Sequence, residues 1–459
     1  MAQRSRLPWL VLALLVAGLL AYLVATGFSL PAAPVLSLHP TPKGIGRHSE
    51  TVVTVEAPAG SLASVSAELV QQGKSLPLGN LSLPTASPWS LRRGEAKKVE
   101  LPLQLGKDAH PELVPGQAVL RITATPAGTW LRQPAPVVSE FSLPVAFSPP
   151  ELGVSSTQNN VAQGGSEVVV YHVGASASRD GVAAGDWFFP GYPLPGGSAG
   201  DRFCLFAAPY DLGDPAKIRL VAEDALGNRS ERAFVDRFTA RPLHTATLEV
   251  NDAFLSRVVP EILSQTQEVT DQGDLLQSYL VINRDLRKKN NQQLAHLAES
   301  SEPRFLWASA FRQLPNSAVM AHFADRRTYV YGGKPIDQQD HLGFDLASHQ
   351  HAPVAAANRG KVVFAGPLGI YGNAVVLDHG YGLASLYAHL SKIDVAVGQE
   401  VEPGAALGLT GATGLAGGDH LHFSILIQGL AVSPVEWWDA KWIRDHLKAK
   451  LGNALPFAE

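Results

Sequence analysis

The sequence predicts a mainly β protein that has an N-terminal transmembrane helix, two β-sandwich segments, a short helical region and a C-terminal β-rich domain. Three observations carry this prediction: an uncharged apolar run near the start, period-two alternation over the first half, and one stretch of helical periodicity after it. At 459 residues the chain is also too long to fold around a single core.

The composition is that of a globular protein, with 46% hydrophobic and 17% charged residues. The formal net charge of −4 provides no basic field, so we expect no nucleic-acid partner. Cys204 is the only cysteine, which excludes an intramolecular disulfide and leaves His, Asp and Glu as ligands for any metal site. We expect Cys204 itself to be a buried, unreactive residue.

The apolar run extends from Leu7 to Phe28, and it lies between Arg6 and the next charged residue, Lys43. Twenty-two helical residues rise about 33 Å, which is enough to cross the hydrocarbon core of a bilayer. Arg4 and Arg6 favour a cytoplasmic N-terminus, so residues 7–28 would anchor the chain in the inner (cytoplasmic) membrane as a single pass, with the bulk of the chain periplasmic or extracytoplasmic. A cleaved signal peptide is the alternative, but its apolar core would be only about 7–15 residues long.

Alternating apolar residues predict the first sandwich. Val65, Ala67 and Leu69 form one such run, and a second surrounds Ile122. Pro149-Pro150 then marks a boundary, and the next β-rich segment contains an acidic Gly-Asn turn at 223–228 that resembles bacterial immunoglobulin-like modules. The predicted divisions are a cytoplasmic stub, anchor and spacer over 1–34, a β-sandwich domain over 35–148, and an immunoglobulin-like domain over 149–245.

The helical region is predicted over 246–302. Leu275, Tyr279, Ile282 and Leu286 fall on one stripe of an amphipathic helix, and the basic residues near them lie largely off that stripe. After Pro303 the pattern returns to short strands and glycine turns, which predicts a final domain over 303–459.

Eight of the fifteen histidines lie between positions 322 and 422. His420 and His422 follow a glycine-rich turn, and residues two apart in a strand share a face, so both can point into one site. His341 and Asp345 form a second group of donors. Imidazole and carboxylate donors suit zinc, and three protein ligands would leave a position open for water. The spacing is not decisive, however, because His349 and His351 form a second His-x-His pair.

A combined motif pattern resolves this choice by resemblance. Residues 323–437 resemble the lysostaphin or LytM-type family of zinc endopeptidases. The landmarks occur in the family's order: Phe323-Ala-Asp-Arg-Arg327, His341-Leu-Gly-Phe-Asp345, Val354-Ala-Ala356, Gly360-Lys-Val-Val363, Gly372-Asn373, Asp378-His379-Gly380, Tyr387-Ala-His389-Leu390, Gly398-Gln399, Gly411-Ala-Thr-Gly414 and His420-Leu-His-Phe423. The resemblance implies a small antiparallel β-sandwich peptidase domain with its core at 323–437.

Carried over residue by residue, the resemblance places the ligands of one Zn²⁺ per chain on His341, Asp345 and His422. It places two non-ligand catalytic residues on His389 and His420, without saying which is the base. His349 and His351 match no site position, and His379 falls in a structural turn. Tyr331 is the candidate for an active-site tyrosine.

The resemblance therefore implies a zinc-dependent endopeptidase that cuts peptide cross-links of bacterial peptidoglycan, with cell-wall or division proteins as further partners. Two alternatives remain open at this point. One is a non-catalytic LytM-type regulator that activates cell-wall amidases. The other is a binding module whose sandwich domains localise a partner.

Overall fold

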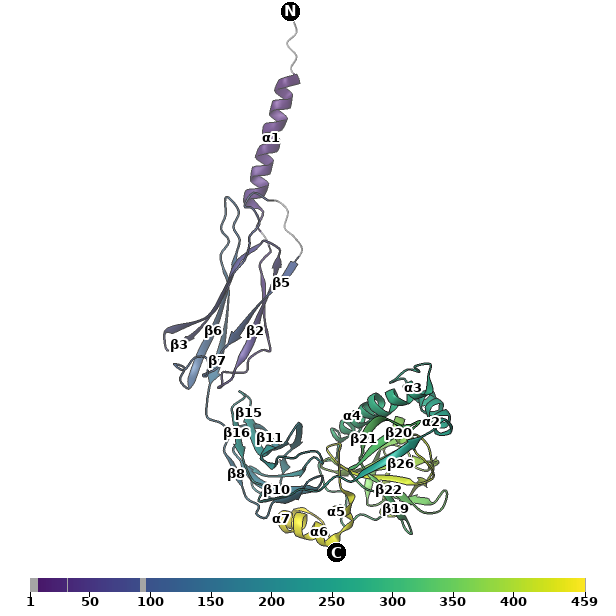
Figure 1. Ribbon diagram of the computed structural model, residues 1–459. Helices are drawn as coiled ribbons and strands as arrows, with labels where there is room; N and C mark the ends of the chain where they lie inside the picture. The colour runs from purple at the N-terminus through teal and green to yellow at the C-terminus, as the bar shows by residue number, and fades with distance from the viewer. Residues whose placement is uncertain (1–6, 31, 91–95, 459) are drawn as a thin grey trace, which may run out of the picture. The chain divides into compact units, whose positions relative to one another are not determined.

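The computed structural model describes residues 7–30, 32–90 and 96–458 (Figure 1). The predicted cytoplasmic stub and Pro31 of the spacer therefore lie outside the described residues. The chain divides into two compact units, one made of residues 1–150 with 223–229 and the other of residues 151–222 with 230–459. Strands dominate both units, as predicted.

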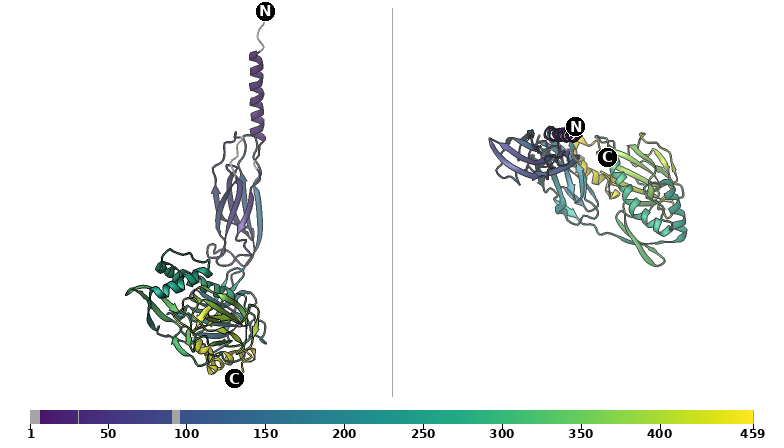
Figure 2. Two further views of the ribbon diagram at one scale, coloured as in Figure 1. Left: turned by 90° about the vertical axis from the view of Figure 1, so that its right-hand side faces the viewer. Right: turned by 90° about the horizontal axis from the view of Figure 1, so that it is seen from above.

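The first unit begins with α1 (Leu7–Phe28), a single helix that is long and apolar enough to cross a membrane. A sandwich of two antiparallel sheets follows, and Figure 2 shows α1 leaving the loops at one end of it. One sheet has the order β1 (Val35–His39), β2 (Glu50–Pro58), β5 (Ala96–Gln104); the other has the order β4 (Lys74–Ser82), β3 (Leu62–Gln71), β6 (Gly116–Pro126), β7 (Val137–Val145).

The alternation in the sequence predicted this sandwich correctly. Val65, Ala67 and Leu69 on β3 lie opposite Ala124, Ile122 and Leu120 on β6. All six side chains are buried in one cluster between the sheets. The two runs recognised in the sequence are therefore direct partners across a strand pair.

The second unit starts with two further four-stranded sheets. Their orders are β13 (Tyr192–Pro193), β14 (Asp201–Ala207), β10 (Ser166–Val173), β8 (Leu152–Val154), and β12 (Trp187–Pro190), β11 (Ala177–Ala184), β15 (Ile218–Asp224), β16 (Arg229–Arg232). Cys204 is fully buried on β14, where burial raises the pKa of its thiol, in line with the expected unreactive role.

The helical region consists of α2 (Asp252–Gln265), α3 (Leu275–Val281), a π-helical turn (Ile282–Leu286) and α4 (Arg287–Ala298). Asn251 and Asp274 cap α2 and α3, each accepting a hydrogen bond from a backbone N–H of the first turn. The predicted stripe is buried from Tyr279 onward, whereas Leu275 is partly exposed. These helices cover one face of the C-terminal sheet (Figure 1) and share a core with it.

That sheet has the order β19 (Ala318–Ala321), β22 (Phe344–Ala347), β30 (Leu421–Ile427), β26 (Leu383–Leu390), β25 (Asn373–Gly380), β24 (Gly360–Pro367), β28 (Glu400–Val401), with β31 (Leu430–Val432) on β30. A small sheet, β23 (Pro353–Ala355), β29 (Ala406–Leu409), β27 (Lys392–Ile393), accompanies it. A third sheet consists of β18 (Thr245–Val250), β20 (Asp325–Tyr331) and β21 (Lys334–His341), in which β18 is parallel to β20.

The chain ends in a helical segment that joins the two halves of this second unit. It comprises α5 (Pro434–Trp438), α6 (Ala440–Trp442), a π-helical stretch (Ile443–Lys448) and α7 (Ala449–Leu451). The buried carboxylate of Glu436 accepts hydrogen bonds from Ser166 and Arg241. Glu167, which is fully buried on β10, is paired with His446 and Lys450. Each buried charge thus has a partner from a distant part of the chain.

Candidate metal centre

Strands of two sheets position the donors of the site. His341 ends β21, Asp345 lies in β22 and His422 lies in β30. Asp345 and His422 are direct partners in the antiparallel pairing of β22 with β30, so their side chains emerge side by side. Gly343 permits this approach, because a Cβ atom there would lie 2.5 Å from Nε2 of His422.

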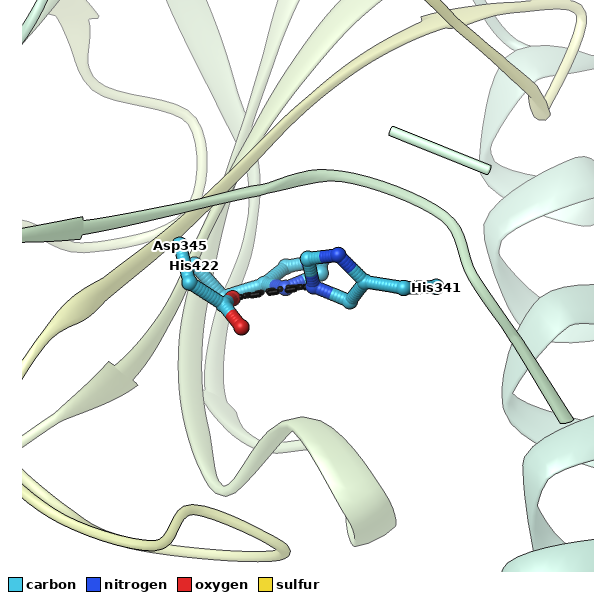
Figure 3. Close-up of side chains that lie close together, drawn as sticks. All are labelled: His341, Asp345 and His422. Carbon is cyan, nitrogen blue, oxygen red and sulfur yellow. Dashed lines mark hydrogen bonds and ion pairs between the residues drawn. The ribbon is translucent and has the colours of Figure 1, made fainter. Parts of the chain in front are cut away.

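The three side chains converge on one point (Figure 3). Nε2 of His341 is 2.9 Å from Oδ1 of Asp345 and 3.0 Å from Nδ1 of His422, and the last two atoms are 3.0 Å apart. Each residue is at least nine-tenths buried. Three polar atoms therefore share one small space that is shielded from bulk water.

Outer hydrogen bonds fix which imidazole nitrogens carry protons. Nδ1–H of His341 donates to the carbonyl of His322 over 2.9 Å. Ser424 donates its hydroxyl to the carbonyl of Leu342, so its oxygen accepts the proton of His422 Nε2. Both inward nitrogens are therefore lone-pair acceptors in the neutral rings, and burial lowers the pKa of His422 to about 4.

In these neutral tautomers two nitrogen lone pairs and a carboxylate oxygen face one another. Such a group is costly to bury unless a cation lies between the acceptors. The number and type of donors fit a three-ligand zinc site, and the outer hydrogen bonds are of the kind that orient metal-bound histidines.

Arg327 orients the carboxylate of this group. Its Nη2 lies 2.8 Å from Oδ2 of Asp345, which leaves Oδ1 directed toward the two histidines. Burial alone would raise the pKa of Asp345. Interactions with the neighbouring imidazoles of His341, His420 and His422 outweigh burial and hold that pKa well below its usual value, so the carboxylate is ionised.

His389 and His420 lie beside the three donors, with ring centroids 4.9 Å apart. Nδ1–H of His389 donates to the carbonyl of Thr413, and Nδ1–H of His420 donates to that of Gly418. In the neutral form of each ring Nε2 is an acceptor, whereas Nε2 of a protonated His420 donates to Asp345. His389 adopts the left-handed backbone conformation (φ +62°), a constraint typical of a positioned side chain.

The two histidines differ in their electrostatic surroundings. Burial, reinforced by His420 and His422, holds the pKa of His389 well below its usual value. Burial also acts to lower the pKa of His420, but the hydrogen bond to Asp345, whose Oδ1 lies 3.4 Å away, outweighs it and raises that pKa.

All five residues line one open cleft with a volume of about 820 Å³. The helical region forms part of its wall. Arg257 on α2 donates to the carbonyls of Ala412 and Ala416, and Glu261 accepts from the N–H of Gly414. The glycine-rich loop before His420 is thus held by a helix that lies more than 150 residues earlier in the chain.

The remaining candidates lie elsewhere. His349 and His351 are exposed in the turn between β22 and β23. His379 is fully buried between the carbonyl of Arg359 and Ser385. Tyr331 donates to Asp252 and does not line the cleft.

Sequence reasoning gave no role to several residues of the site. Tyr371 is one of the tyrosines that line the cleft, and its ring centroid is 5.5 Å from that of His422. Tyr371 directly precedes the Gly372-Asn373 motif, and Arg327 is the last residue of the Phe323–Arg327 motif. Both residues could therefore have been proposed as site residues from the sequence. The role of Ser424 depends on a contact across strands, which no local pattern displays.

Residues 339–434 match the model of peptidase family M23. The C-terminal domain is a peptidase family M23 domain. This finding confirms the resemblance seen in the sequence and, since the family consists of metallopeptidases, it accords with the His-Asp-His group. The matched residues include His341, Asp345, His389, His420 and His422, whereas the helical part of the cleft wall lies outside the match.

Three curated relatives are similar to a part of this chain. DD-carboxypeptidase/endopeptidase Mpg of Neisseria meningitidis is 44% identical over 95 residues, 21% of this chain and 22% of the relative. Peptidoglycan DD-endopeptidase ShyA of Vibrio cholerae is 33% identical over 132 residues, 28% and 30% of the two chains. Murein hydrolase activator EnvC of Escherichia coli is 37% identical over 95 residues, 21% and 23%. The chain thus covers less than a third of each relative.

Among solved structures, the catalytic domain of the antimicrobial peptidase lysostaphin from Staphylococcus simulans is 30% identical, with a TM-score of 0.24, and covers 27% of this chain and 94% of that domain.

Proposed function

We propose that the M23 domain is a zinc-dependent endopeptidase that hydrolyses peptide cross-links of bacterial peptidoglycan. His341, Asp345 and His422 would hold one zinc ion, and His389 and His420 would act on the reacting groups. The observation that carries this proposal is the convergence of three buried donor atoms, with the outer nitrogen of each imidazole hydrogen-bonded to another group. The peptidoglycan substrate rests on the similarity to ShyA.

Zinc bound at this position supplies Lewis acidity that brings the pKa of a coordinated water near neutrality. The chain's own residues supply the proton transfers. Nε2 of His389 or His420 can accept the proton of the attacking water, since Nδ1 of each ring is already committed to a carbonyl. The other ring, once protonated, donates a hydrogen bond to the oxyanion that forms on the scissile carbonyl.

The direct test is digestion of purified muropeptide dimers by the full-length chain in detergent, followed by mass spectrometry. We expect cross-linked dimers to be converted to monomers. The activity should disappear with a chelator and return when zinc is added. Intact dimers after incubation with zinc-loaded protein would contradict the endopeptidase proposal.

A second candidate function is the activation of a cell-wall amidase, which the similarity to EnvC favours. In that case the chain alone would release nothing from sacculi, whereas an amidase with the chain would release more peptide than the amidase by itself. The His422→Ala variant separates the candidates, because an activator that acts by contact would keep its effect when the metal donor is lost.

We also propose that α1 anchors the chain in the cytoplasmic membrane with the M23 domain outside the cytoplasm, where peptidoglycan is accessible. Fractionation of cells expressing the full-length chain tests this placement. Recovery in the soluble periplasmic fraction would contradict it.

A further inference from the structure

The end of α1 is enclosed by the fold of the first unit. Thr26 and Gly27 are buried, although most of the helix before them is exposed. The loops that surround them come from residues more than sixty positions later, near Trp89 and between Ala127 and Arg132. The last turns of the apolar helix are therefore also a part of the sandwich domain.

Specific contacts hold these loops to the helix. The indole N–H of Trp130 donates to Oγ1 of Thr26 over 3.0 Å, and the Tyr22 hydroxyl donates to the carbonyl of Trp89 over 2.7 Å. The hydroxyl of Thr129 donates to the carbonyl of Gly27 over 2.7 Å. Three hydrogen bonds thus hold the last one and a half turns of α1 to the loops of the sandwich.

The packing around Gly27 is equally close. A Cβ atom at this position would lie 3.1 Å from the indole ring of Trp130 and 3.2 Å from Leu131. The rings of Trp89 and Trp130 stack on each other, with centroids 4.9 Å apart and planes within 8°. The guanidinium of Arg132 lies over the ring of Phe28, 4.5 Å from its centroid.

This group nevertheless presents a large apolar surface. Trp89, Trp130 and Leu131 are 45%, 38% and 50% exposed, and the adjoining helix exposes Leu19, Leu20 and Val24. The rise along the helix from Tyr22 to Phe28 is about 9 Å. In a membrane-spanning α1 the two tryptophans would therefore lie at the level of the lipid headgroups, where amphipathic indole rings are favoured and an arginine can reach phosphate.

We propose that Trp89, Trp130, Leu131 and Arg132 form an interfacial collar that inserts into the headgroup region of the membrane that α1 crosses. The occupant of this surface is the lipid bilayer. The collar also implies that α1 is not cleaved from the mature chain. Removal of residues up to Gly27 or beyond would take away the partners of Trp130, Trp89 and Thr129. The proposal rests on the membrane anchoring of α1 proposed above; it concerns the first unit alone and is independent of the metal site.

The test uses the full-length chain in phosphatidylcholine vesicles whose acyl chains are brominated near the headgroup end, because bromine quenches tryptophan fluorescence at short range. Trp9 on α1 is first replaced in a Trp9→Phe protein. We expect quenching in this protein and its nearly complete loss when Trp89→Phe and Trp130→Phe are added. Absence of quenching in the Trp9→Phe protein, or equal quenching in both, would overturn the proposal and indicate that another partner covers the collar.

A matched control uses the opposite end of the same sandwich. Val114 is exposed just before the start of β6, whereas Trp130 follows the end of that strand. Val114→Trp in the protein that lacks Trp9, Trp89 and Trp130 should restore no quenching by the brominated lipid. Quenching there as strong as that at the collar would mean that the sandwich lies on lipid without orientation, which contradicts the proposal.

A second measurement does not depend on the variants folding. The mass of the mature wild-type chain, purified from membranes, should include α1. A mature chain that begins after Gly27 would overturn the proposal whatever the fluorescence shows.

Discussion

Two His-x-His pairs lie within 75 residues of each other, and only one of them is part of a site. His420 and His422 stand at the start of β30, between β22 and β26, where strands on both sides supply Asp345 and His389. His349 and His351 have the same spacing but occupy an exposed turn. Nδ1 of His351 contacts Ser391 and a carbonyl, and the backbone N–H of the same residue donates to Asp419.

The difference between the pairs lies in their neighbours. A central strand of a sheet brings side chains from two flanking strands next to its own, so donors accumulate on one face. A turn between strands has no such flanks, and its histidines meet mainly solvent. The His-x-His spacing alone therefore does not predict metal binding. It does so only where neighbouring strands place further donors beside the pair.

The largest effect should come from removing a donor within the buried pair. We expect His422→Ala to lose both zinc and endopeptidase activity, because two remaining ligands are too few for a stable site. Zinc content by plasma mass spectrometry and muropeptide cleavage would be measured on the same preparation. Full zinc occupancy in the variant would show that the donor set is wrong.

The second prediction distinguishes the role of His420 from that of His422. His420→Ala should keep its zinc and lose about 10²–10⁴-fold in turnover, since a positioned acid or base contributes that much. His389→Ala should behave in the same way. The measurement is zinc content beside initial cleavage rate. Loss of zinc in His420→Ala with retention in His422→Ala would reverse the assigned roles.

The third prediction concerns a buried histidine outside both pairs. Burial lowers the pKa of His379 to about 4, whereas the unfolded chain has the ordinary value of 6.5. The unfolded state therefore binds the proton first as the pH falls. The neutral ring contributes its full stability above pH 6.5, and this contribution declines as the pH falls toward 4.

Between pH 6.5 and 5 the decline should be about 2 kcal/mol in the free energy of unfolding. His379→Gln should remove most of this slope while keeping a polar side chain opposite Ser385. Urea unfolding at several pH values, followed by tryptophan fluorescence, measures both. An unchanged slope in the variant would show that His379 is not the group responsible.

The smallest effect should come from the exposed pair. His349→Ala combined with His351→Ala should leave zinc content and turnover unchanged and cost about 1 kcal/mol or less in stability. The contact from the backbone N–H of His351 to Asp419 survives the substitution, because it does not involve the side chain. Zinc loss in this double variant would show that the exposed pair, and not the buried one, supplies zinc ligands.

The sequence by itself determined the architecture and the chemistry of the donors. Alternation predicted the pairing faces of β3 and β6, because period-two patterns follow directly from strand geometry. The apolar run predicted α1, and the ordered motifs singled out five residues that the structure brings together in the cleft. These features are local or follow a fixed order along the chain, so a single sequence displays them.

Only the tertiary structure decided how these residues are oriented. The carbonyls of His322, Thr413 and Gly418 fix the imidazole protons, and Arg327 turns Asp345 inward. Backbone carbonyls are present at every position, so no residue type marks those that a histidine will meet. The enclosure of Gly27 by the loop around Trp130 could not be predicted either, because the two segments lie about a hundred residues apart in the sequence. Contacts of this kind follow from strand register and packing, which exist only in the folded chain.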